Sequence, residues 1–301
     1  MPTNISDATY FELRLIEEAC RIRQIPFKYA ADLKRYTQLV HVSHGAIANS
    51  RIAIQESRLE NGLDTFINEI DEQENIRKSR LIDFLWIGRK NIGDRVADVD
   101  LLFANKNIGP ISLKSGGEGT ERNLGGKKIK NLIGYDSQIT IAEMKKDTIK
   151  SLKALHPKID FGNSWSSIKK AIKDHPDEIN MRAAANLNGK KYQLIIADQL
   201  IHSWESSSEI QKMNLLAYLA LQNDIRDKGL RIFVACDDKA YLKNPLNISH
   251  YSANILNLTK NTKSVLGTLD FSIDTTPHWR LNINFTNGLG LSPLAIRVFN
   301  Y

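Results

Sequence analysis

Two aspartates and a lysine lie close together on runs that have the composition of β-strands. Asp98 and Asp100 are two positions apart, so on a strand both side chains point to one face of a sheet. Ser112 and Lys114 have the same spacing in the next run. If the two runs pair as a hairpin, two carboxylates and one ammonium converge. Because adjacent carboxylates repel and hard cations prefer oxygen ligands, we expect a Mg²⁺ site suited to phosphodiester hydrolysis, with Lys114 orienting water or stabilising developing charge.

The segment 95–117 resembles the PD-(D/E)xK nuclease superfamily, and within it the type II restriction endonucleases. That family places an acidic residue at the start of one hairpin strand and, after a variable gap, an acidic residue, any residue and a lysine on the next. Asp98 is the better counterpart of the first acidic residue, with Asp100 as the rival. Residues 112–114 supply the second part. The resemblance implies that these residues form the catalytic and metal-binding site.

This segment departs from the family pattern at two positions. Ala97 takes the place of a proline, and Ser112 takes the place of the second acidic residue. Completing the coordination of a metal then calls for a further carboxylate. The candidates are Glu69 in the preceding helical stretch and Glu118 and Glu121 in the following loop, and the spacing selects none of them.

The resemblance implies Mg²⁺-dependent, site-specific cleavage of double-stranded DNA. Cutting both strands favours a homodimer with two active sites, and a monomer acting twice is the alternative. Two other functions stay open. One is a repair, recombination or phage DNA-processing nuclease of the same fold. The other is a non-catalytic DNA-binding protein that has lost its metal site, which the serine at 112 would suit.

A glycine-rich segment at 115–131 follows the lysine strand and predicts a loop. It is not a Walker A phosphate-binding loop, because Glu121 and Lys128 occupy the positions of the first glycine and of the Ser or Thr. In a nuclease this loop would approach DNA. Its candidate DNA-binding residues are Arg122, Lys127, Lys128 and Lys130.

The periodicity of the chain predicts an α/β or α+β fold with a mixed central sheet flanked by helices, in a restriction-endonuclease-like core. The helical periods are expected in the first 80 residues (one or two long helices at 50–80) and at 147–155, 164–174 and 208–228. The strands are expected in three runs between 81 and 115, at 192–198, at 230–237 and in the last 50 residues. We accordingly expect an N-terminal helical region at 1–80, a nuclease core at 81–240 with its catalytic hairpin at 95–115, and a β-rich C-terminal portion at 241–301 packed on the core.

Charge and composition narrow the class of protein. A net charge of +7 and a pI near 9.2 are compatible with a polyanionic partner. No apolar run is long enough to cross a membrane and no signal peptide is recognisable, so we expect a cytoplasmic protein without membrane partners. Cys20 and Cys236 are expected to be free thiols. His41 and His44 have no third ligand nearby, which argues against zinc.

Overall fold

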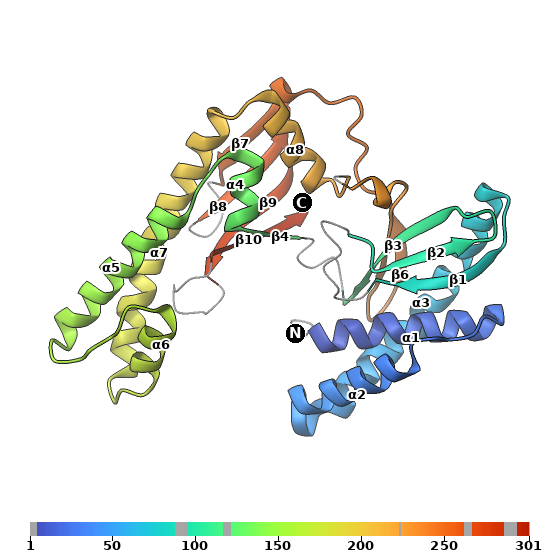
Figure 1. The fold of residues 1–301 in the computed structure, drawn as a ribbon, viewed down its shortest axis with the longest axis horizontal. Helices are drawn as coiled ribbons and strands as arrows, with labels where there is room; N and C mark the ends of the chain where they lie inside the picture. Colours follow the sequence, from blue (N-terminus) through green and yellow to red (C-terminus); the bar gives the residue numbers. More distant parts are fainter. Residues whose placement is uncertain are drawn as a thin grey trace. The chain divides into compact units, whose positions relative to one another are not determined.

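The elements of the chain gather into two units, in a computed structural model that describes residues 5–87, 96–116, 122–222, 224–261, 267–285 and 294–300 (Figure 1). The first unit comprises residues 1–119 and 220–247, and the second comprises 120–219 and 248–301. Each unit contains its own five-stranded sheet together with helices. The predicted mixture of helices and strands is therefore confirmed at the level of an α+β class.

Helices precede the sheet of the first unit. They are α1 (Ile5–Arg23), α2 (Ala30–His44), the 3₁₀ turn η1 (Gly45–Ile47) and α3 (Ala48–Arg77). The periodicity at 50–80 correctly predicted α3, whose Leu59, Phe66 and Ile70 are buried at helical spacing. Lys78, with a left-handed φ of 48°, ends this helix.

The sheet of the first unit mixes antiparallel and parallel pairing. Its strands are β1 (Leu81–Trp86), β2 (Val99–Phe103), β3 (Ile108–Ser115), β5 (Arg231–Ala235) and β6 (Ala240–Lys243), in that order across the sheet. β1, β2 and β3 lie in the three runs expected as strands and form an antiparallel meander that includes the predicted hairpin, and β3 pairs in parallel with β5. The predicted strand at 230–237 is confirmed as β5. The 3₁₀ turn η2 (Ile225–Asp227) precedes it.

The two faces of this sheet have different surroundings. On one face α1 and α3 cover a large core, which includes the alternate residues Val99, Leu101 and Phe103 of β2. Gly62 permits the close approach of α3, because a Cβ there would lie 2.8 Å from the Phe233 ring. The opposite face carries a smaller apolar cluster. Its buried members are Ile87, Ala97, Leu221, Leu230, Ile232 and Val234.

The second unit combines a helical layer with an antiparallel sheet. Its helices are α4 (Gly126–Ile133), α5 (Gln138–Leu155), α6 (Trp165–Lys173), α7 (Glu178–Glu205), α8 (Glu209–Leu219) and the 3₁₀ turn η3 (Ala253–Ile255). Its strands are β4 (Arg122–Gly125), β7 (Leu256–Lys260), β8 (Thr268–Ile273), β9 (Thr276–Phe285) and β10 (Leu294–Asn300). They run in the order β4-β10-β9-β8-β7. The alternation in the last 50 residues correctly predicted strands there.

The long helix α7 packs against both α5 and the sheet of this unit. It lies beside α5, where the buried Asn188 amide donates hydrogen bonds to the Met144 carbonyl (3.2 Å) and to Thr148 Oγ1 (2.7 Å) (Figure 1). On the sheet side, the Trp204 and Phe271 rings meet edge to face with centroids 5.2 Å apart. These contacts fix α5 and α7 as one layer over the sheet.

Three expected elements differ in the structure. The predicted strand at 192–198 is wrong, because these residues belong to α7 and are buried at helical spacing, Tyr192 and Ile196 with Leu200. A short apolar run alone does not distinguish a buried strand from a buried helix. The helix expected at 208–228 ends at Leu219. The glycine-rich segment forms β4 and α4 from Arg122 onward, while residues 117–121 lie outside the described residues.

Within the described ranges, no helix has the length and apolarity needed to span a bilayer. Cys20 and Cys236 are both free thiols, as expected, with Cys20 buried.

Candidate active site

Asp98 lies immediately before β2 and is held on both sides by neighbouring strands. Its N–H donates to the Ile111 carbonyl (2.9 Å), and its carbonyl accepts from the N–H of Ile87 (3.0 Å). One carboxylate oxygen, Oδ2, accepts two further hydrogen bonds, from Ser112 Oγ (2.9 Å) and from the N–H of Leu113 (2.7 Å). The orientation of the carboxylate is therefore fixed by the hairpin itself.

Lys114 brings a positive charge to the same carboxylate. Its Nζ lies 3.9 Å from Asp98 Oδ2, and the two side chains are 27% and 26% exposed, respectively. The pair is accordingly reachable from solvent, whereas Ser112 between them in the register is fully buried. The structure thus brings together three of the predicted catalytic residues, Asp98, Ser112 and Lys114.

Asp100 lies on the same face of the sheet but deeper within it. It pairs with Pro110 in the register, whereas Asp98 comes opposite Ser112, on the side toward Lys114. Its side chain is almost completely buried. Of the two rival aspartates, Asp98 is therefore the accessible one and the one beside the lysine.

Glu69 is not brought to this site, which corrects its assignment as a metal ligand. It lies in α3, on the opposite face of the sheet, where its side chain is fully buried and its Oε2 accepts a hydrogen bond from Arg231 Nη2 at 2.9 Å. Its Oε1 accepts from Gln73 Nε2 at 2.5 Å. Because both oxygens are bound within this network, Glu69 has a structural role. Glu118 and Glu121 lie outside the described residues.

The donor set fits a magnesium ion held by few protein ligands. No hydrogen bond or ion pair to another described residue engages Asp98 Oδ1, on a partly exposed carboxylate. Mg²⁺ commonly binds one or two carboxylates and retains waters or substrate oxygens for the remaining positions. Among the residues that the structure describes, no group of three or more His, Cys, Asp or Glu side chains could hold a metal. The fit is thus to an ion held by Asp98, with Asp100 as the second candidate carboxylate on the same face of the sheet.

The candidate DNA-binding residues belong to the second unit, whereas Asp98 and Lys114 belong to the first. Arg122 begins β4, and the three lysines lie in α4. Lys130 forms an exposed ion pair with Asp136 at 2.6 Å, and Lys128 Nζ lies 4.8 Å from the centroid of the Tyr218 ring.

Two contacts that position the site were not predicted from the sequence. The carboxylate of Asp227 accepts a hydrogen bond of 2.7 Å from the N–H of Val96, two residues before Asp98. The amide of Leu113 binds Asp98 directly. The first contact joins positions 131 residues apart, and the second depends on the strand register. Neither leaves a local signal in the sequence.

Comparisons with known proteins yield no relative: no model of a protein family, no curated protein and no solved structure matches the chain. We therefore infer function from the side chains around Asp98 alone.

Proposed function

We propose that the chain is a Mg²⁺-dependent endonuclease that hydrolyses phosphodiester bonds in double-stranded DNA at specific sites. The observation that carries this proposal is the approach of Lys114 Nζ to within 3.9 Å of Asp98 Oδ2 across a β-hairpin, on a partly exposed face. A fixed carboxylate beside an ammonium is the combination that the PD-(D/E)xK pattern assembles on its hairpin. The restriction-endonuclease-like core is part of the same proposal.

Each residue of the cluster has a defined task. Ser112 and the Leu113 amide fix Asp98 Oδ2, and Oδ1 would bind the cation. Mg²⁺ bound there would stabilise negative charge on the phosphoryl group and lower the pKa of a bound water. Lys114 would hydrogen-bond the attacking water or an anionic oxygen of the phosphate, and stabilise charge that grows in the transition state.

Double-strand cleavage adds a requirement for assembly. One chain contributes one Asp98–Lys114 pair, so we propose a homodimer that presents a pair to each strand. Lysines and arginines of β4 and α4 would contribute phosphate contacts, which position the duplex without reading its sequence. A monomer that cuts the strands in succession would fit the same site.

Digestion of plasmid and phage DNA tests the proposal. Purified protein is incubated with Mg²⁺ or with EDTA, beside Lys114→Ala and the control Lys34→Ala, which removes the same charge from an exposed position of α2. We expect discrete fragments with Mg²⁺ for wild type and Lys34→Ala, and none for Lys114→Ala or with EDTA.

Other outcomes identify the alternatives. Nicks or structure-dependent cuts that require Lys114 would indicate a repair or recombination nuclease. Intact DNA under all conditions, with a folded protein that still binds duplex DNA, would indicate a non-catalytic DNA-binding protein, the hypothesis that the serine at 112 suits.

A further inference from the structure

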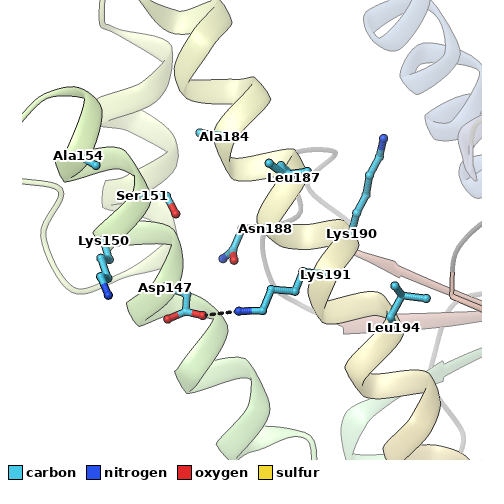
Figure 2. A pocket seen from close by; sticks show the side chains of 10 residues that line it. All are labelled: Asp147, Lys150, Ser151, Ala154, Ala184, Leu187, Asn188, Lys190, Lys191 and Leu194. Carbon is cyan, nitrogen blue, oxygen red and sulfur yellow. Dashed lines mark hydrogen bonds and ion pairs between the residues drawn. The ribbon is translucent and has the colours of Figure 1, made fainter.

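A groove of about 820 Å³ lies between α5 and α7 of the second unit, and none of its lining residues belongs to the candidate active site (Figure 2). Small side chains line it, Ser151 and Ala154 from α5 and Ala184 from α7, with the buried Asn188 between the helices. Figure 2 shows Leu187 and Leu194 two turns apart along α7. The groove therefore combines an apolar surface with small side chains that would let a partner approach the two helices closely.

Leu187 and Leu194 expose apolar surface to solvent beside the groove. Leu187 is 72% exposed, and Leu194 on the same side of α7 is 39% exposed. Burying a leucine side chain is favourable, because it removes apolar surface from water. Two exposed leucines beside a groove of small residues offer an apolar surface that a partner could bury.

Lysines surround the apolar part. Lys191 pairs with Asp147 at 3.1 Å across the groove, as the dashed line in Figure 2 marks. Lys150 and Lys190, by contrast, have no carboxylate within ion-pair distance among the described residues. Lys150 and Lys190 therefore have charge available for a partner.

The net charge of the second unit is positive, like the charge of the groove lysines. Residues 1–119 and 220–247 contain 21 Lys and Arg and 21 Asp and Glu, so the first unit is neutral. Residues 120–219 and 248–301 contain 20 basic and 13 acidic residues, so the entire net charge of +7 belongs to the second unit. An acidic occupant is attracted to this unit over distances comparable to the Debye length.

We propose that this groove binds an acidic amphipathic helix of a partner protein. Its apolar side chains would lie between α5 and α7 against Leu187 and Leu194, and its carboxylates would pair with Lys150 and Lys190. The lining residues extend over about 10 Å of α5 and about 15 Å of α7, which corresponds to two to three turns of a helix. Packing into the furrow between two helices is a common mode of helix recognition.

Duplex DNA accounts for these observations less well. Phosphates would pair with the lysines, but a phosphate backbone offers no apolar surface for Leu187. The proposal is independent of nuclease activity, because none of the groove residues belongs to the Asp98 cluster.

Fluorescence anisotropy on the full chain tests the proposal. The probe is a labelled synthetic peptide of about four helical turns, with leucines on one face and glutamates on both flanks. A peptide of the same composition in scrambled order is the reference. We expect wild type to prefer the amphipathic peptide by about tenfold or more, with weaker binding as salt rises.

Two pairs of variants test the location. Leu187→Asp, and Lys150→Glu combined with Lys190→Glu, should each weaken binding at least tenfold. The controls make the same changes at exposed positions outside the groove, as Ile179→Asp and as Lys158→Glu with Lys173→Glu. The controls should bind like wild type, and because all these positions are exposed, circular dichroism should show unchanged folding.

Three results would overturn the proposal. Equal affinity for both peptides would show that binding does not require an amphipathic helix. An equal loss of peptide affinity in groove and control variants would show that the peptide does not bind in the groove. The third is a wild type that ignores the peptide but binds a short DNA duplex, weakened by the two lysine substitutions and unaffected by Leu187→Asp. That result would make this face a phosphate-binding surface.

Discussion

Ser112 Oγ donates a 2.9 Å hydrogen bond to Asp98 Oδ2, at the position where the nuclease pattern has an acidic residue. A carboxylate at 112 would stand beside that of Asp98 and repel it in the absence of a cation. The serine instead binds and orients Asp98 before any metal arrives. The hairpin therefore holds its candidate metal ligand in place without a second carboxylate at this position.

Ser112→Ala should remove this orientation. Because the hydroxyl is fully buried and bonded to a carboxylate, we expect a loss of about 1–2 kcal/mol in the free energy of unfolding, measured in urea. Cleavage should fall together with the affinity for Mg²⁺. Ser272→Ala is the matched control, since this buried hydroxyl of β8 makes no side-chain hydrogen bond among the described residues, and its stability should stay within about 0.5 kcal/mol of wild type. Equal stability of the two variants would contradict the role of Ser112.

Glu69 should matter for stability and not for metal binding. Removing one partner from a buried ion pair leaves an uncompensated charge, so Glu69→Ala should cost about 3 kcal/mol. Glu72 lies 3.4 Å from the same Arg231 but is 53% exposed. Glu72→Ala should therefore lower the free energy of unfolding by less than about 0.5 kcal/mol. The Mg²⁺ dependence of cleavage should be unchanged in Glu69→Gln. If Glu69→Gln needed a higher Mg²⁺ concentration for cleavage, Glu69 would be a metal ligand after all.

Among the α4 lysines, Lys127 should contribute most to DNA affinity. Lys130 is paired with Asp136 and Lys128 lies over the Tyr218 ring, so both already have an intramolecular partner. Lys127→Ala should reduce the slope of log affinity against log salt by about one, as expected for one lost phosphate contact. Lys130→Ala should have a smaller effect. Binding is measured in EDTA, where cleavage does not interfere, and a larger effect for Lys130 would contradict this order.

The two cysteines should differ in reactivity. Burial, followed by the nearby Asp83 carboxylate, raises the pKa of Cys20 to about 11. Because the thiolate is the reactive form, Cys20 should resist Ellman's reagent near pH 8 in the folded protein, while the more accessible Cys236 reacts. Denaturation should release both thiols at comparable rates. Rapid reaction of two thiols in the folded protein would show that the environment of Cys20 is open.

The fold was predictable where local pattern determines structure. The helical period at 50–80 predicted α3, and the apolar runs between 81 and 115 predicted β1, β2 and β3 with their hairpin. The prediction of a strand at 192–198 was wrong. These residues are buried because α7 packs against α5 and the second sheet, and a short apolar run fits a buried helix as well as a buried strand. The return of the chain to β5 after residues 120–219 of the second unit was also beyond local pattern.

The candidate site was predictable in part for the same reason. Spacing on paired strands brought Asp98, Ser112 and Lys114 together. It could not show that Glu69 faces the other side of the sheet, because this depends on the direction in which α3 packs. It could not show that Asp100 is buried, because this depends on what covers the face opposite to α3. The contact from Asp227 to Val96 depends on tertiary structure alone.

A double-mutant comparison of cleavage rates tests whether Asp98 and Lys114 form one catalytic unit. Loss of supercoiled plasmid is followed for wild type, Asp98→Asn, Lys114→Ala and the double variant, all in Mg²⁺ and all verified as folded. If the two side chains act on one phosphate as a unit, each single variant should lose about a thousandfold or more, and the double variant should be little worse than either. An inactive wild type, or single variants that cleave as fast as wild type, would contradict the assignment of this hairpin as the active site.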